Sequence, residues 1–217
     1  MAFTNTGVQI AVMLSLSHVA YAGDLEVLIR DEAGNPVEGA VVELINTGLP
    51  QPSDWPQTAV IDQINKEFVE PVLAIVAGTS VSFPNSDDVH HHVYSFSPTK
   101  RFELPLYTGD PAAPVEFDTP GVVTIGCNIH DWMVGYIYVG ESHLMAISNV
   151  DGVGSISDLP AGIYTARMWH KGSGVGQELA EFTVEVPATG VAQHSVSLTE
   201  QPAFATRRAP LPGLRSY

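Results

Sequence analysis

Short apolar runs separated by turn residues constrain the fold of this chain more than any other feature. Asp24–Ile29 alternates apolar and polar side chains, Val41–Ile45 is nearly continuous, and Val122–Gly126 leads into the single cysteine. Such runs are typical of β-strands, and the 19 glycines and 16 prolines of the chain are typical of the turns that join them. No helical apolar period persists beyond the N-terminal region. The sequence therefore predicts an all-β protein of sandwich or barrel topology.

The length and charge of the chain limit its domain count and its partners. With 217 residues, 45% of them apolar, it can form one large or two small β domains with proper cores. Its formal net charge of −15 repels phosphate backbones, so we expect no nucleic-acid partner. The acidic surface can attract a basic protein at low ionic strength, or simply keep an exported protein soluble.

The N-terminus predicts export. Residues 8–20 are mostly apolar, and Ala20-Tyr21-Ala22 then provides the small-x-small cleavage pattern of a secretory signal peptide. The apolar stretch is short for a membrane-spanning helix, and no later segment is long and apolar enough for one. We therefore expect residues 1–22 to be a signal peptide and the mature protein to be periplasmic. Residues 200–217 hold three prolines and three arginines without periodicity, so we expect a mobile tail there.

The only cysteine, Cys127, lies in a motif typical of a metal site. A lone cysteine forms no intramolecular disulfide, and a free thiol in an oxidising compartment needs a reason. Residues 126–133 read GCNIHDWM, which places His130 and Met133 in a C-x2-H-x2-M pattern between two predicted strands. Thiolate, imidazole and thioether suit copper that cycles between Cu(I) and Cu(II). The alternatives are an inert buried thiol and a zinc site, although methionine is a poor zinc ligand.

A second imidazole is available from three consecutive histidines, residues 90–92. His91 and His92 point to opposite faces of a strand, so only one of them can face a metal in the sheet. We predict His91 as the ligand, with His90 and His92 as alternatives and a surface histidine cluster as the competing interpretation. Asp87 and Asp88, just before this run, are expected to cap a turn. The predicted metal ligands are His91, Cys127, His130 and Met133.

The segment 59–140 resembles the cupredoxins of the plastocyanin, pseudoazurin and amicyanin kind. Val81–Asp87 is similar to the family's strand and turn before the first ligand, and the short Cys-x2-His-x2-Met spacing is most similar to amicyanin. The resemblance implies a Greek-key β-sandwich that holds one type 1 copper ion. The family usually has an asparagine after the first ligand, which ties the two ligand loops together. Here His92 stands in its place, so a different lock is expected.

The regions on either side of this segment resemble a second family. Residues 34–42, GNPVEGAVV, and residues 158–164, DLPAGIY, are similar to the two halves of a carboxypeptidase regulatory-like, transthyretin-like β-sandwich. This implies that residues 23–58 and 141–199 form one small sandwich, with the cupredoxin domain, residues 59–140, inserted after its second strand. Insertion is tolerated where the ends of the inserted domain lie close together.

The cupredoxin resemblance implies single-electron transfer without enzymatic activity. His130 would pass the electron at the surface beside Trp132 and Met133, to a redox partner such as a dehydrogenase or a cytochrome. Copper tolerance or delivery, with a copper-handling partner, is the alternative that the histidine run favours. A multicopper enzyme would need a second His-x-His pair, which the sequence lacks. A structural or adhesive role for the flanking sandwich also stays open.

Overall fold

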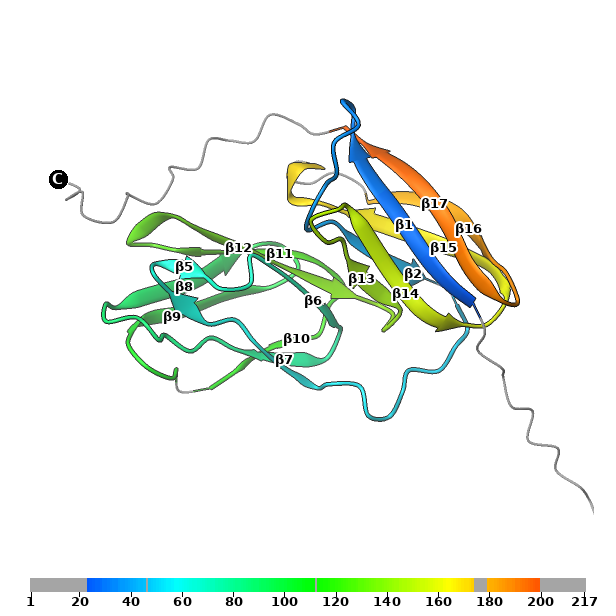
Figure 1. Cartoon of the computed structure of the whole chain (residues 1–217). Coiled ribbons are helices and arrows are strands. Elements are labelled where there is room, and N and C mark those ends of the chain that lie inside the picture. Colours follow the sequence, from blue (N-terminus) through cyan, green and yellow to red (C-terminus); the bar gives the residue numbers. More distant parts are fainter. Residues whose placement is uncertain (1–22, 46, 112, 174–178, 200–217) are drawn as a thin grey trace, which may run out of the picture.

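The computed structural model describes residues 23–45, 47–111, 113–173 and 179–199. Within these ranges every regular element is a β-strand, apart from one turn of 3-10 helix, Lys171–Ser173. The predicted all-β class is therefore confirmed, and the strands form two sandwiches that lie side by side (Figure 1). The described part of the chain has no helix long and apolar enough to cross a membrane. The predicted signal peptide and C-terminal tail lie outside the described residues.

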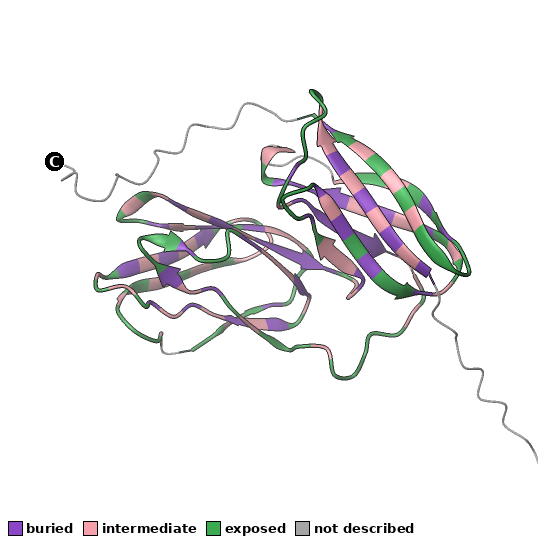
Figure 2. Ribbon diagram, in the orientation of Figure 1, coloured by how far each residue is buried: buried purple, intermediate pink, exposed green. Residues whose placement is uncertain are grey.

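The flanking sandwich is built from both ends of the described chain. Its two sheets have the strand orders β14-β1-β17 and β13-β2-β15-β16. Alternate residues of β1 are buried, so Leu25, Val27 and Ile29 face the opposite sheet while their neighbours are partly exposed (Figure 2). Its strands are β1 (Gly23–Asp31), β2 (Val41–Ile45), β13 (Met145–Ile147), β14 (Val153–Leu159), β15 (Gly162–Trp169), β16 (Ala180–Val186) and β17 (Gly190–Leu198).

The inserted sandwich lies between β2 and β13 in the chain. Its larger sheet has the strand order β6-β12-β11-β8-β9, and a smaller sheet has the order β10-β7-β3. Phe83, Phe117 and Ile137 are fully or almost fully buried in its core. Its strands are β3 (Thr58–Val60), β4 (Gln63–Ile64), β5 (Glu67–Phe68), β6 (Val72–Val76), β7 (Thr79–Ser82), β8 (His91–Phe96), β9 (Arg101–Tyr107), β10 (Val115–Phe117), β11 (Gly121–Cys127) and β12 (His130–Gly140).

The β4–β5 hairpin is an element that the sequence does not predict. Its two strands have two residues each, too few to show an alternating pattern. Asn65 and Lys66 form the tip, and both have positive φ, 57° and 60°. Two consecutive residues of this conformation are typical of the tight turn that matches the twist of paired strands. The backbone amides of the tip are thereby left free to bond outside the hairpin.

A buried junction joins the two sandwiches. Tyr138 of β12 packs with Val41, Val72 and Trp169 in a small apolar cluster that draws residues from both. Beside it, the fully buried Glu43 of β2 accepts hydrogen bonds from the Tyr138 hydroxyl, at 2.7 Å, and from two backbone amides just after β12, at 2.6 and 2.7 Å. Burial, together with the Glu43 carboxylate, raises the pKa of Tyr138. The junction therefore combines apolar packing with a carboxylate whose bonds are satisfied across the two sandwiches.

Gly140 makes this approach of Glu43 possible. A Cβ atom at residue 140 would lie 2.8 Å from the Glu43 Oε1 atom and 2.6 Å from the Met145 methyl group. Both distances are shorter than a carbon atom tolerates, so a larger residue here would displace the Glu43 carboxylate or the Met145 methyl group.

Candidate metal centre

Cys127 and His130 are brought together by a tight hairpin. Strand β11 ends at Cys127, β12 begins at His130, and only Asn128 and Ile129 form the turn between them. The two residues stand opposite each other as the last pair of the β11–β12 ladder. The two-residue spacer of the C-x2-H motif is thus the connection that places a thiol beside an imidazole.

An irregularity in the same ladder accounts for the position of Met133. Gly126 pairs with Val134 while Cys127 pairs with His130, so residues 131–133 of β12 stand opposite no residue of β11. Such a bulge changes which face of the sheet the following side chains take. Met133 is 1% exposed and belongs to the same apolar cluster as Cys127. The thioether is therefore buried on the core side, at the end of the sheet that carries the cysteine.

His91 reaches this end of the sheet from β8. The strand pairs with β11 so that Val93 stands opposite Cys127, and His91 lies two residues beyond, on the same face as Val93. His91 is fully buried, whereas the next residue, His92, faces the other way. The His92 Nε2 atom lies 2.9 Å from the Glu103 carboxylate on the outer face of the sheet.

The three side chains form one compact cluster. The Cys127 Sγ atom lies 3.7 Å from His91 Nδ1 and 3.5 Å from His130 Nδ1, and the two imidazole ring centres are 4.9 Å apart. One donor atom from each residue lies within 4.8 Å of the other two. Among the described residues this is the only group of three or more histidine, cysteine or acidic side chains that could hold a metal ion.

Burial and charge suit these groups to metal binding. His91 is 0% and Cys127 3% exposed, so water has little access to them, while His130 is half-buried. The pKa of His130 lies below its usual value, first because the ring is partly buried and then because protonated His91 and Lys66 would repel its positive charge. A lowered pKa favours the neutral form of the His130 ring, in which a nitrogen lone pair is available to a metal.

The donor set fits copper better than zinc. Two imidazole nitrogens and one thiolate form the strong donors, and the buried thioether of Met133 is available as a weak fourth ligand, the combination that suits a copper electron-transfer site. Structural zinc prefers four strong nitrogen or sulfur ligands, which the cluster does not provide. The Asp87 carboxylate is close but contacts Nε2 of His91, the nitrogen that points away from Cys127.

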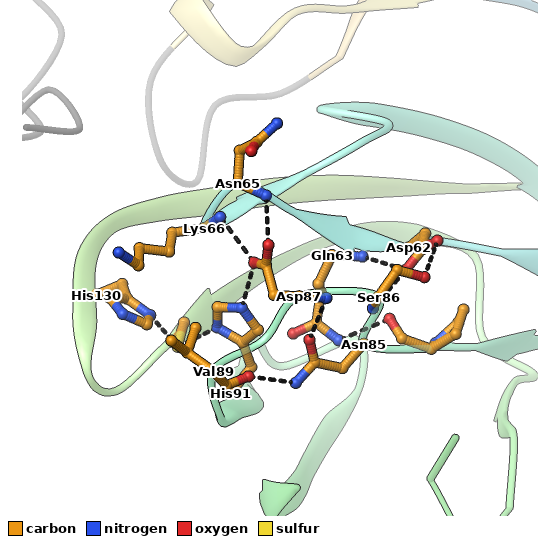
Figure 3. Close-up of polar contacts among 12 residues, drawn as sticks. Asp62, Gln63, Asn65, Lys66, Asn85, Ser86, Asp87, Val89, His91 and His130 are labelled. Atoms are coloured by element: carbon orange, nitrogen blue, oxygen red, sulfur yellow. Dashed lines mark hydrogen bonds and ion pairs between the residues drawn. The ribbon is translucent and has the colours of Figure 1, made fainter. Parts of the chain in front are cut away.

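Asp87 has a role different from the one expected. The sequence predicts that it caps a turn, but its carboxylate lies 2.7 Å from His91 Nε2 and accepts hydrogen bonds from the backbone amides of Asn65 and Lys66 (Figure 3). Burial opposes ionisation of this carboxyl, but the bonds from Lys66, His91 and Asn65 outweigh it and hold the pKa of Asp87 below its usual value. The sequence does not predict the bonds from Asn65 and Lys66 to Asp87, because it does not predict the β4–β5 hairpin that carries them.

Asn85 shapes the loop that carries His91. This buried side chain donates hydrogen bonds to the backbone carbonyls of Val89 and Tyr107, and it accepts one from the Asp87 amide. The loop before β8 is thus fixed by side chain to backbone bonds, which is why Asp87 and His91 face each other four residues apart. Asn85 belongs to the segment Val81–Asp87, which resembles the cupredoxins, so this segment also holds the loop that carries His91.

His90 is exposed, just before β8. The three histidines that are scattered in the sequence, His143, His170 and His194, are outside the cluster. The ring of His143 packs against Trp55, and the ring of His194 stacks on Phe182. His170 donates a hydrogen bond to the backbone carbonyl of Glu38. Each of the three therefore has a packing or hydrogen-bonding role.

Comparison with known proteins adds several structural likenesses. No family model and no curated protein matches the chain. A reduced variant of amicyanin is 20% identical, covers 46% of this chain and 98% of its own, and has a TM-score of 0.35. A purple cupredoxin from Nitrosopumilus maritimus is 26% identical over 38% of this chain and 99% of its own, with a TM-score of 0.34. A copper-containing nitrite reductase from Thermus scotoductus is 24% identical over 46% of this chain and 25% of its own, with a TM-score of 0.37.

Because these TM-scores are low, the case for a metal rests on the donor atoms themselves. The cluster of His91, Cys127 and His130 lies at the end of a mixed β-sandwich, and Met133 is buried beside the cysteine. It comes from two separate segments of the chain that the fold brings to one edge.

Proposed function

We propose that this protein is a non-enzymatic electron carrier with one type 1 copper ion bound by His91, Cys127, His130 and Met133. The observation that carries the proposal is the convergence of His91, Cys127 and His130: one donor atom of each lies within 4.8 Å of the other two, and the Cys127 Sγ atom lies 3.7 and 3.5 Å from the Nδ1 atoms of the two histidines. Bound copper would supply a one-electron redox couple; the chain itself supplies the donors and excludes water. A thiolate with two imidazoles and a weak thioether is suited to both oxidation states.

The rigidity of the donors supports electron transfer. His91 lies at the start of β8, Cys127 at the end of β11, and His130 and Met133 on β12, so three neighbouring strands of one sheet hold all four. Ligands fixed by a sheet move little when the charge of a bound ion changes. A small rearrangement favours fast electron exchange.

The half-buried edge of His130 is where we propose that the electron enters and leaves. Ile129 is 48% exposed next to it, and the Trp132 ring lies 5.4 Å from the His130 ring. An apolar rim around a partly exposed ligand suits a brief contact with another redox protein, such as a dehydrogenase or a cytochrome. The net charge of −15 favours a partner with a basic surface.

Copper tolerance or delivery is the alternative function, and burial counts against it. Handing over copper requires that a partner's ligand replaces the protein's own ligands one by one. His91 is 0% and Cys127 3% exposed, so only the His130 side is open to such an attack. We therefore favour a resident ion. Export to the periplasm by the predicted signal peptide belongs to the same proposal.

For the flanking sandwich we propose a structural role, as a module of the transthyretin-like kind. Its seven strands in two sheets and its apolar core support this assignment. In the described residues it contributes no side chain to the metal centre.

The proposal is tested by adding Cu(II) to the purified protein and recording visible absorption and electron paramagnetic resonance. We expect an intense thiolate-to-copper band that is abolished in Cys127→Ala and in His91→Ala. His92→Ala is the matched control, because this histidine is adjacent in sequence but faces the opposite side of the sheet, and it should keep the band. A colourless wild-type protein with an ordinary tetragonal Cu(II) signal would refute the proposal.

A further inference from the structure

The Asp87 carboxylate receives three hydrogen bonds from two different parts of the chain. Its Oδ2 atom lies 2.7 Å from His91 Nε2 and 2.8 Å from the Lys66 amide nitrogen, and its Oδ1 atom lies 2.6 Å from the Asn65 amide nitrogen. The side chain of Asp87 is 10% exposed. A carboxylate with this many donors is held in one orientation, and the donors prefer its ionised form.

The hairpin tip is shaped to bind this carboxylate. Asn65 and Lys66 both have positive φ, so their consecutive amides point to the same side. Consecutive backbone N–H groups in such a turn form a small concavity that favours an anion. The tip therefore grips Asp87 through its backbone, independently of the two side chains at the tip.

The other side of the tip is tied to the segment that carries Cys127 and His130. The indole N–H of Trp132 donates a hydrogen bond of 3.1 Å to the backbone carbonyl of Lys66. Trp132 lies between the ligand residues His130 and Met133 and packs against the His130 ring. A continuous path of hydrogen bonds thus runs from His91 through Asp87 and the hairpin tip to Trp132.

We propose that Asp87 is a positioning residue for the metal centre, and that with the Asn65–Lys66 tip and Trp132 it locks the two ligand segments together. The inference rests on the copper function proposed above. It also provides a contact between the two ligand segments in place of the one that the family's asparagine makes. His92, which stands in the place of the family's asparagine, bonds to Glu103 on the outer face and so cannot tie the ligand loops.

The bond from Asp87 has two consequences for His91. A carboxylate accepts hydrogen bonds, so it keeps the hydrogen on Nε2 of His91. The Nδ1 atom, on the side of Cys127, then keeps its lone pair for a metal. The negative charge on the far nitrogen also makes the ring a stronger donor. A stronger donor stabilises Cu(II) more than Cu(I), because the higher charge of Cu(II) gains more from it.

Asparagine at residue 87 tests the charge with little change in shape. The side-chain amide of asparagine has only one acceptor oxygen. It therefore cannot accept the bond from the backbone N–H of Asn65 together with the bonds from the backbone N–H of Lys66 and from His91. Asp87→Ala removes the acceptor entirely. Asp88→Asn and Asp88→Ala are the matched controls, since this neighbouring aspartate is exposed. Trp132→Phe removes only the indole hydrogen bond at the other end of the path.

The first measurement uses the metal-free protein, so it does not depend on whether copper binds. Nitrogen-15 NMR of the His91 ring should show the Nε2–H tautomer in the wild type and in both Asp88 variants, and a mixture of tautomers in Asp87→Ala. An Nδ1–H tautomer in the wild type, or a tautomer that Asp87→Ala leaves unchanged, would overturn the inference.

The second measurement compares Cu(II) and Cu(I) affinities. Loss of such a partner costs about 10- to 100-fold in metal affinity, and we expect Asp87→Asn to lose more affinity for Cu(II) than for Cu(I). Each tenfold difference raises the reduction potential by about 59 mV for one electron. Trp132→Phe should loosen the same centre and broaden its charge-transfer band. Wild-type band and potential in Asp87→Asn would overturn the inference, whereas a wild type without the band would refute the copper function instead.

Discussion

The two sandwiches bury polar groups in different places. In the flanking sandwich the fully buried carboxylate, Glu43, faces the junction, and the sheets themselves enclose an apolar core. In the inserted sandwich, the buried Gln63 and Asn85 bond to the segment before β8, which carries His91 into the cluster with Cys127 and His130. Each such group is costly to bury unless its hydrogen bonds are made.

The difference indicates where in a β-sandwich a cluster of polar, metal-binding side chains can lie. Apolar side chains from the strands fill the cores of both domains. At the strand ends the backbone leaves the sheet and its amides become available, as at the tip of the β4–β5 hairpin. In the inserted sandwich, loops satisfy a network of polar groups there, as the bonds of Asn85 and Asp87 show.

Core truncation in each sandwich gives the largest effect and tests whether they unfold together. We expect Leu44→Ala in the flanking sandwich to lower the free energy of unfolding by about 2–5 kcal/mol, and Phe117→Ala in the inserted one by about 3–5 kcal/mol. Because the junction is buried and satisfied, both variants should show a single cooperative transition in chemical denaturation. Val191→Ala, at an exposed position, is the control and should change stability by less than about 0.5 kcal/mol. Two separate transitions would show that the sandwiches are independent.

Copper binding should stabilise the inserted sandwich and, through the junction, the flanking one. At a free copper concentration a thousand times the dissociation constant, the free energy of unfolding should rise by about 4.1 kcal/mol, because the ion binds the folded form only. Hydrogen exchange of β1 and β15 amides, far from the site, checks whether the gain is shared. Cys127→Ala should lose the gain. Protection that rises only in β8, β11 and β12 would contradict a shared transition.

Tyr138→Phe sharpens the comparison at the junction. The variant keeps the aromatic packing on Trp169 but leaves one oxygen of the buried Glu43 carboxylate without its donor. Hydrogen bonds to charged groups contribute about 1.5–3 kcal/mol, so stability should fall by about that amount. Tyr136→Phe, on the same strand and against the same tryptophan, is the matched control and should cost less. Equal losses in the two variants would show that Glu43 does not hold the junction.

The smallest expected effect is an alkaline one in the inserted sandwich. Burial, opposed by a hydrogen bond from Gln63 and aided by the nearby Cys127 and Asp62 charges, raises the pKa of Tyr107 to about 12, against about 10 in an unfolded chain. The fold favours the neutral phenol, so its contribution to stability is complete below pH 10 and is lost as the pH rises through 12. Denaturation midpoints measured across this window should fall less steeply in Tyr107→Phe than in the wild type. Identical slopes would contradict the assignment.

Sequence patterns predict those parts of the molecule in which local signals suffice. Val41–Ile45 is a strand with the expected bounds, and the all-β class follows from many such runs. The predicted ligand residues His91, Cys127 and His130 come together because the C-x2-H spacing is a hairpin turn and because β8 pairs with β11. The chemistry of a site can be predicted before the fold is known where its residues form one contiguous motif.

The unpredicted parts depend on contacts between distant segments. Asp87 resembles a turn cap in the sequence, and its bonds to Asn65 and Lys66 join residues more than twenty positions apart through a hairpin too short to show periodicity. Likewise, nothing in the run Val41–Ile45 distinguishes Glu43 from an exposed residue of a half-buried strand. Its burial depends on the end of β12, whose following backbone amides bond to it.

The length of β12 sets a fixed spacing in the molecule. This one strand begins at the candidate ligand His130 and ends at Gly140, against the Glu43 carboxylate. Ten residue steps along a strand span roughly 30 Å, so the junction lies at the opposite end of β12 from His130, and Figure 1 shows the flanking sandwich beside one end of the inserted one. In the described residues, the contact between the two sandwiches therefore stays clear of the His130 edge.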